Sequence, residues 1–286
     1  MEKKLHPVLR FAFSIEFIRA IKRNLEEATV LIEEVPAGER HRLSHLFAEQ
    51  KNLHLICEGI LREGVGQAFT DNIQSPSTAL LARGPIVFLS GDEKNPAASE
   101  LLNRVEQKRL IFIPDDKWKT AIENHWGDKL RTYPRTRFLS DNLDIEYMRE
   151  IQEGIPVGMK IRSVTRNSIG RISDQAKGIV RLLFSSLDQF LETNFGFCIE
   201  SGKRIVSLAL AATPIYNGHF EIHIETDPDH QKMGLAAIVC AKLIEYSLEH
   251  GLTPHWDADN PPSAKLATKL GFSSPEQYNA YFWIDG

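Results

Sequence analysis

Ionisable and apolar side chains alternate along one segment in the last quarter of the chain. Within Phe220–Thr226, Glu221, His223 and Glu225 alternate with apolar residues, so a β-strand would place the three ionisable groups on one face. A carboxylate or imidazole held beside a reacting amine can remove its proton, which is general base catalysis. The same pattern also occurs on solvated strand faces and in cross-strand ion-pair ladders, so the segment supports either interpretation.

The segment directly after this strand has the composition of an anion-binding turn. Gln231-x-x-Gly234-x-Ala236 places two small residues at alternate positions, at the start of an apolar helix that ends near His250 and Gly251. Small side chains let a phosphate approach the unpaired N–H groups of a first helical turn, where the helix dipole favours negative charge. We therefore predict a pyrophosphate-binding cradle of six consecutive residues: Gln231, Lys232, Met233, Gly234, Leu235 and Ala236.

A second helix start follows one more predicted strand, Thr253–Asp257. Asn260 is a suitable N-cap residue with proline directly after it, and Gly271 ends the short helix before Phe272. Together with the first segment, this resembles the GNAT superfamily of acetyl-CoA-dependent N-acetyltransferases, with its motifs Arg/Gln-x-x-Gly-x-Gly/Ala and Asn-x-x-Ser/Ala followed by Leu-Gly-Phe. Residues 160–283 are also similar to a bacterial two-domain group that includes zwittermicin A resistance proteins.

The resemblance implies that the protein transfers an acetyl group from acetyl-CoA to the primary amine of a small molecule. A lysine-like amine is neutral in only about one molecule in 10³ at pH 7, so a base is valuable. Glu221 is the first choice, because its distance upstream of Gln231 resembles that of the base in several GNAT enzymes. Glu225 and His223 are the alternatives.

The resemblance also implies which residues contact the cofactor and which could act as the general acid. Besides the cradle, the expected cofactor contacts are Ile224, Thr226, Asn260 and Ser263. Many GNAT enzymes have a tyrosine acid where this chain has Ala267. Tyr278, Tyr281 or water could replace it, although both tyrosines also suit the core of a terminal strand.

Composition limits the class of protein. The chain has 286 residues with 42% hydrophobic and 25% charged content, a net charge of −4 and a pI near 6.2. These values are typical of a globular protein and give no general attraction for nucleic acid or anionic membranes. Three widely spaced cysteines indicate neither a disulfide framework nor a metal site. No long apolar run or signal peptide is evident, so we expect a cytoplasmic protein. We also expect no metal, acetyl-CoA and a small amine as partners, and a possible homodimer.

Two α/β parts are expected, with the boundary in Gly154–Gly158, so that residues 1–155 and 156–286 form separate domains. Residues 156–286 are expected to have the GNAT fold, a mixed, mostly antiparallel sheet flanked by helices. Residues 1–155 lack the cradle motif, and one interpretation is that they form a degenerate GNAT-like half. Its role would be to shape the acceptor cleft or a dimer. The predicted helices are 16–26, one or two within 41–61, 116–125, 142–153, 169–184 and 187–193, and the predicted strands before the cradle are 67–70, 79–82, 86–89, 110–113, 159–164, and a pair around Cys198 and Val206.

A different class of function is a non-catalytic module that binds CoA or acyl-CoA as a sensor or scaffold. It would keep the cradle and would explain Ala267, but it would leave Glu221, His223 and Glu225 without a task. Release of thiol from acetyl-CoA in the presence of amines distinguishes the two classes.

Overall fold

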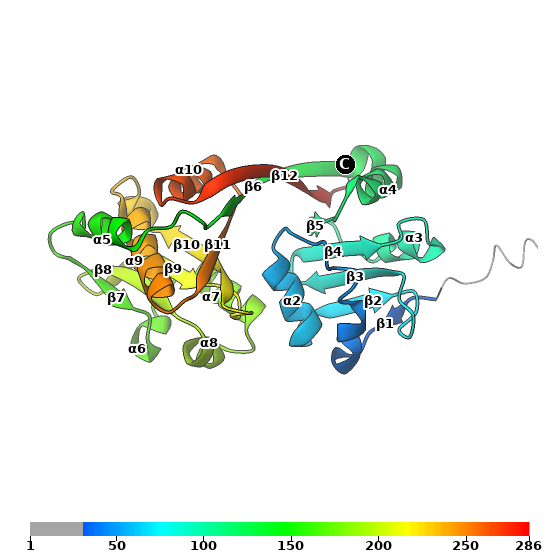
Figure 1. Ribbon diagram of the computed structural model, residues 1–286, viewed down its shortest axis with the longest axis horizontal. Helices are drawn as coiled ribbons and strands as arrows, with labels where there is room; N and C mark the ends of the chain where they lie inside the picture. The colour runs from blue at the N-terminus through cyan, green and yellow to red at the C-terminus, as the bar shows by residue number, and fades with distance from the viewer. Residues whose placement is uncertain (1–30, 286) are drawn as a thin grey trace, which may run out of the picture. The chain divides into compact units, whose positions relative to one another are not determined.

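The computed structural model describes residues 31–285, and within that range twelve strands join into one sheet of mostly antiparallel pairing. Only β4 with β5 and β10 with β11 run parallel in the described part. The strand order is β1-β2-β3-β4-β5-β12-β6-β11-β10-β9-β8-β7 (Figure 1). The strands are β1 (Glu33–Glu34), β2 (Gln67–Thr70), β3 (Thr78–Arg83), β4 (Ile86–Gly91), β5 (Leu110–Phe112), β6 (Leu130–Leu139), β7 (Met159–Ser163), β8 (Gly196–Ser201), β9 (Arg204–Ala211), β10 (His219–Thr226), β11 (Thr253–Ala258) and β12 (Ser273–Trp283).

Helices flank this sheet. They are α2 (His54–Arg62), α3 (Pro96–Asn103), α4 (Asp116–Trp126), α5 (Ile145–Glu153), α6 (Arg166–Ile169), α7 (Asp174–Leu183), α8 (Leu187–Thr193), α9 (Leu235–Glu249) and α10 (Pro261–Lys269), with 3₁₀ turns η1 (Ala37–Leu43), η2 (Gly127–Lys129) and η3 (Pro228–His230). No helix in residues 31–285 combines the length and the apolar character needed to cross a membrane.

The long strands β6 and β12 connect the two halves of the sheet. β12 lies between β5 and β6, and β6 lies between β12 and β11. The predicted boundary at residues 155 and 156 falls in the segment between α5 and β7, so β6 precedes it and β12 follows it. Each half of the sheet therefore contains a strand from the other side of this boundary, and the division into two domains stays a prediction.

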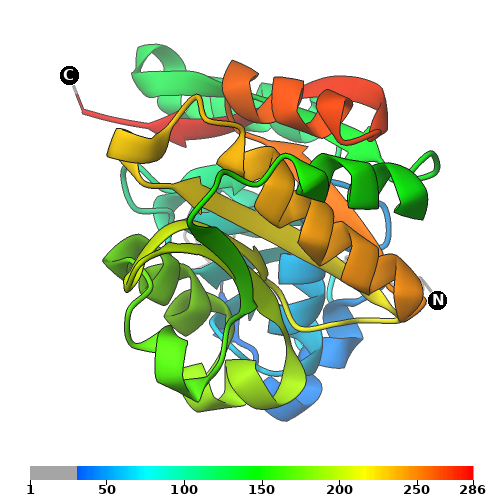
Figure 2. The ribbon, with the colours of Figure 1, turned by 90° about the vertical axis from the view of Figure 1, so that its left-hand side faces the viewer.

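Helix α9 lies across the strands that carry the predicted site (Figure 2). Its residues are apolar on most sides because β8–β11 pack beneath it and α5 packs beside it. Glu245 on α9 accepts hydrogen bonds from Arg149 and Gln152 of α5 and from Lys242. These bonds outweigh burial and lower the pKa of Glu245 to about 2. Helix α9, whose first residues Leu235 and Ala236 end the cradle, is thus held to α5 by hydrogen bonds as well as by apolar packing.

Most predicted elements are confirmed within a few residues. Asp115 and Asn260 accept backbone N–H groups as the N-caps of α4 and α10, and Gly202 makes the turn of the β8–β9 hairpin at φ +60°. The helix predicted over 169–184 is shorter, because Ser173 caps a new helix that starts at Asp174. The helix predicted over 16–26 lies outside the described residues.

Strand β6 was not predicted. Its sequence contains three arginines and Pro134 and has no regular apolar alternation. The arginines are accommodated because Arg135 and Arg137 form ion pairs with Asp257 and Glu276 of neighbouring strands. Cross-strand pairing therefore replaces the apolar pattern that sequence analysis relies on.

Candidate active site

Strands β10 and β11 pair over only part of their length. Their parallel pairing ends at Glu221 and His255. Beyond that point β10 continues along β9, and β11 continues along β6. The two strands therefore separate, and a wedge remains between Ile222–Thr226 and Trp256–Ala258, which we call the β10–β11 opening.

Hydrogen bonds fix which backbone groups of β10 face this opening. The N–H of Glu221 donates to Thr213 Oγ1 at 3.0 Å, and its carbonyl accepts an N–H at 2.7 Å from the segment after β9. Successive residues of a strand direct their backbone groups to opposite sides. Those of Ile222, Ile224 and Thr226 are thus directed toward the opening, where Ile224 and Thr226 are the two strand residues predicted to contact the cofactor.

The cradle between β10 and α9 offers free backbone donors. Gly234 is the N-cap of α9 with φ +81°, and no side chain caps this helix. In the described part of the chain, the N–H groups from Lys232 to Ala236 have no hydrogen-bond partner. A Cβ atom on Gly234 would meet nothing within 4 Å, so the space in front of these donors is open. Free N–H groups at a helix start, facing open space, fit a phosphate group.

Asp227 holds the turn that leads into the cradle. Its carboxylate accepts the N–H of Asp229 at 3.1 Å and lies 3.2 Å from His230 Nδ1 and 2.5 Å from Arg204. The hydrogen bond with His230 is the main cause of the lowered pKa of Asp227. The turn after β10 is therefore fixed by side-chain contacts, with Pro228 preventing the strand from continuing.

Glu221 lies at the closed end of the β10–β11 opening, opposite His255. Its side chain is 7% exposed, and its carboxylate accepts no hydrogen bond from any described residue. Burial, aided by the negative charge of Asp257, raises the pKa of Glu221 to about 8. Burial and the neighbouring His54 and His219 rings lower the pKa of His255 to about 4. At neutral pH Glu221 is therefore largely protonated, and the imidazole of His255 beside it is uncharged.

A buried ion pair lies next to Glu221. Arg135 Nε donates to Asp257 Oδ1 at 2.7 Å, and the hydroxyl of Tyr278 donates to Asp257 Oδ2 at 2.5 Å. Burial raises the pKa of Asp257, although Arg135 and Tyr278 oppose this shift. These contacts bring β6, β11 and β12 together at the site and fix the charge that Glu221 faces.

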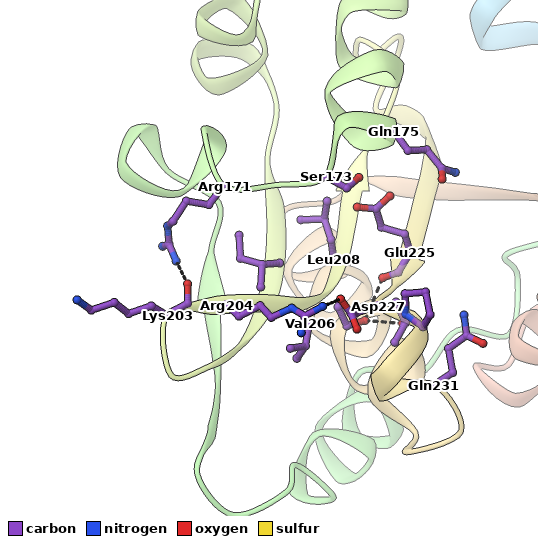
Figure 3. A pocket seen from close by; sticks show the side chains of 14 residues that line it. Arg171, Ser173, Gln175, Lys203, Arg204, Val206, Leu208, Glu225, Asp227 and Gln231 are labelled. Atoms are coloured by element: carbon purple, nitrogen blue, oxygen red, sulfur yellow. Dashed lines mark hydrogen bonds and ion pairs between the residues drawn. The ribbon is translucent and has the colours of Figure 1, made fainter.

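The other two predicted bases lie farther along β10. Glu225 lines a cleft of about 810 Å³ (Figure 3) between the α6–α7 loop, β9 and the end of β10. Burial raises its pKa, but the His223 imidazole, 3.6 Å away, and the hydroxyl of Ser173 outweigh burial and lower it. In Figure 3 the carboxylate of Glu225 points toward Ser173. Glu225 is therefore an ionised carboxylate, and Glu221, four residues earlier, does not line this cleft.

Comparison with known proteins identifies the family. The GNAT acetyltransferase family model matches residues 44–281. The chain belongs to the GNAT acetyltransferase family. The uncharacterized N-acetyltransferase YdfB of Bacillus subtilis (strain 168) is 24% identical over 229 residues, which are 76% of this chain and 85% of that protein. The protein is accordingly an N-acetyltransferase, and GNAT acetyltransferases use acetyl-CoA as co-substrate.

Solved structures agree with this assignment. A GCN5-related N-acetyltransferase-like protein from Streptococcus suis 89/1591 is 28% identical with a TM-score of 0.74, over 87% of this chain and 100% of that one. A tandem GNAT protein from the clavulanic acid biosynthesis pathway, solved without acetyl-CoA, has a TM-score of 0.54 at 13% identity, over 89% of this chain and 98% of its own. The second likeness shows the fold alone.

The residues of the second GNAT motif have structural partners. The Asn260 side chain accepts the N–H of Ser263 at 2.9 Å, and Ser263 Oγ accepts from the Trp256 indole at 3.1 Å. Ala267 is fully buried in the core beneath α9. Cofactor contacts from Asn260 and Ser263 stay a prediction, since capping alone accounts for the contact that Asn260 makes.

The two tyrosines considered as acids have different surroundings. Tyr281 is buried in a hydrophobic cluster with Trp118 and Ile122, where β12 pairs with β5 and β6. Tyr278 instead bonds to Asp257 beside Glu221. The structure thus brings Tyr278 near the candidate site, and it places Tyr281 in the core of the other half of the sheet.

Sequence analysis missed three histidines near Glu221. His219 and His255 lie on β10 and β11, and His54 begins α2. The alternation along Thr253–Ala258 places His255 and Asp257 on the strand face opposite Trp256. The sequence therefore already indicated that these two residues share a face of β11. Nothing in the local sequence indicates that His54 reaches this site from the other half of the chain.

Proposed function

We propose that the protein transfers the acetyl group of acetyl-CoA to the primary amine of a small molecule by direct attack of the amine on the thioester. The observation that carries this proposal is the β10–β11 opening, which has free phosphate-binding donors at one end and Glu221 at the other. From Glu221 to Thr226 the strand covers about 17 Å. This arrangement suits an extended cofactor whose phosphates and reactive end bind at separate points.

The residues present fit acetyl-CoA. The N–H groups of the cradle would hold the pyrophosphate, and the backbone of Ile224 and Thr226 would hold the arm that leads to the thioester. Bound acetyl-CoA supplies the thioester carbonyl that the amine attacks. A free N–H of β10 in the opening would stabilise the negative charge that develops on the carbonyl oxygen.

Glu221 is assigned as the general base. A base works best when its pKa lies near the working pH. The pKa of Glu221, about 8, is closer to the pKa of an ammonium group than the pKa of an ordinary carboxylate is. Glu225 has a lowered pKa and is the weaker base. Glu225 lines a cleft that Glu221 does not line, so we assign Glu225 no part in the proton transfer.

The acceptor class is proposed from the sequence resemblance alone. The motifs within residues 160–283 that resemble those of zwittermicin A resistance proteins favour an amine-bearing natural product as the acceptor, and metabolite and peptide amines are the alternatives. Residues 1–155 would complete the site, and assembly of two copies is a separate prediction.

Thiol release tests the function directly. Purified protein is mixed with acetyl-CoA and a panel of amines that contains metabolites, peptides and aminated antibiotics, and free CoA thiol is followed with a thiol reagent. The background is low because Cys57, Cys198 and Cys240 are all buried. Amine-dependent release is expected, whereas CoA binding without release by any amine would favour a non-catalytic module.

A further inference from the structure

His54 comes from the half of the chain that has no cradle, yet it reaches the candidate active site. One donor atom from each of His54, Glu221 and His255 lies within 4.8 Å of the other two. The ring centroids of His54 and His255 are 5.1 Å apart. The site is therefore built from both halves of the chain.

The backbone holds His54 in this position. Leu53, its N-cap residue, has φ +49° and ψ +35°, a left-handed conformation that is costly for leucine. Asn52 accepts a hydrogen bond from Arg137 of β6 at 3.0 Å, which ties this segment to the strand beside β11. Such strain persists only where the surroundings enforce it, and here it directs His54 toward Glu221.

Two of the histidines are joined by a hydrogen bond, which is one link of a path for a proton. His219 Nδ1 lies 2.9 Å from His255 Nε2, so one ring donates to the other. All three imidazoles are half-buried, whereas Glu221 is 7% exposed. The histidines are thus partly open to solvent, whereas the nearby carboxyl group is buried.

The proposed chemistry requires such a path. When an ammonium group becomes an amide, its first N–H bond breaks and that proton passes to Glu221. The second proton leaves with the thiolate as CoA thiol, so one net proton must leave Glu221 in every turnover. Because Glu221 is only 7% exposed, neighbouring groups that carry this proton to solvent would speed its release.

We propose that His54, His255 and His219 form a proton relay that returns Glu221 to its ionised form after each acetyl transfer. The proposal rests on the proposed function. The proton moves from a Glu221 oxygen through a bridging water molecule to a ring nitrogen of His255 or His54, which lie within 4.8 Å of Glu221 but are not hydrogen-bonded to it. A proton then passes from His255 to His219 and on to water. His54 is thereby the contribution of the first half of the chain to catalysis.

Charged groups on every neighbouring element face this relay. They are Glu58 of α2, Asp257 of β11, and Arg135 and Arg137 of β6. Two imidazoles and a carboxylate could also bind a divalent metal ion such as zinc. The two arginines and the bond between His255 and His219 make this cluster better suited to protons, and metal content is measured in the test.

The test uses the full chain and an amine that the wild type acetylates. His54→Gln and His255→Ala are compared with His45→Gln, which changes an exposed histidine in the same half of the chain as His54. Both site variants should lower kcat at pH 7 at least tenfold, with the Kd for CoA and the melting temperature nearly unchanged. Added imidazole should restore most of the rate of His255→Ala, because a free ring can carry the proton. His45→Gln should match the wild type.

Three results would overturn the relay. The first is an unaltered kcat and pH profile in both site variants. The second is a lower rate that is accompanied by weaker CoA binding or a lower melting temperature and is not rescued by imidazole, which indicates a structural role. The third is one equivalent of metal in the purified protein together with loss of rate on chelation. If the wild type acetylates no amine at all, the proposed function itself has failed, which is a distinguishable outcome.

Discussion

The ionisation of Glu221 should make the protein less stable as the pH rises. Its pKa moves from the ordinary 4.5 to about 8 because the side chain is buried beside Asp257. The folded state therefore holds this proton more tightly than the unfolded state. The stability that results is fully present below about pH 4.5 and is lost as the pH rises through about 8.

The size of the effect follows from the shift. A pKa moved from 4.5 to about 8 corresponds to about 5 kcal/mol in total. Of this, about 3 kcal/mol falls between pH 5.5 and 8.5. Urea unfolding of the wild type and of Glu221→Gln at both pH values should therefore show the variant gaining about 3 kcal/mol relative to the wild type, since glutamine cannot ionise.

Glu225→Gln is the matched control on the same strand face. The pKa of Glu225 is lowered, so its contribution to stability is present above its unfolded pKa and is lost only as the pH falls below that range. The difference in the free energy of unfolding between Glu225→Gln and the wild type should stay constant from pH 5.5 to 8.5. A difference that is equally constant for Glu221→Gln would refute the reasoning, because the pKa of Glu221 would then be ordinary.

The cradle, the Asp257 carboxylate and the strands β6 and β12, which connect the two halves of the sheet, each give a measurable outcome. Ala236→Glu adds a charge that suits a helix start but repels phosphate, so calorimetry should show CoA binding at least tenfold weaker at an unchanged melting temperature; unchanged affinity would contradict the cradle. Gly234 is unsuited to this test, since φ +81° strains any other residue. Asp257→Asn removes a charge that raises the pKa of Glu221, so the midpoint of the pH profile of kcat/KM should fall by about one unit; a midpoint that stays or rises argues against this coupling. Titration should find one CoA per chain, and residues 156–286 alone should be insoluble because β12 would lose β5 and β6; a second CoA site or a well-folded fragment would show otherwise.

The cradle and its flanking strand could be predicted because local sequence determines them. Alternation gave the strand face of Glu221, His223 and Glu225, and two small residues with a following apolar run gave the helix start. Caps such as Asn260 depend on one side chain and its own backbone, so they too were readable.

What could not be predicted depends on contacts between distant parts of the chain. β6 lacks an apolar pattern, because Arg135 and Arg137 are paired with residues of strands that come more than a hundred residues later. The same holds for His54, whose approach to Glu221 depends on a left-handed Leu53 and on the order of strands in the sheet. Burial of Glu221, which is our reason for proposing it rather than Glu225 as the base, also follows only from this packing.

The pH dependence of acetyl transfer by Glu221→Gln tests the central claim most directly. With an accepted amine, kcat of the wild type should rise with pH to a plateau near pH 8, where Glu221 becomes ionised. The variant should be about 10²-fold slower at pH 7, with unchanged CoA affinity, and should keep gaining rate at higher pH as the amine deprotonates unaided. A variant with the rate and pH profile of the wild type would contradict the account, because Glu221 would then take no proton from the acceptor.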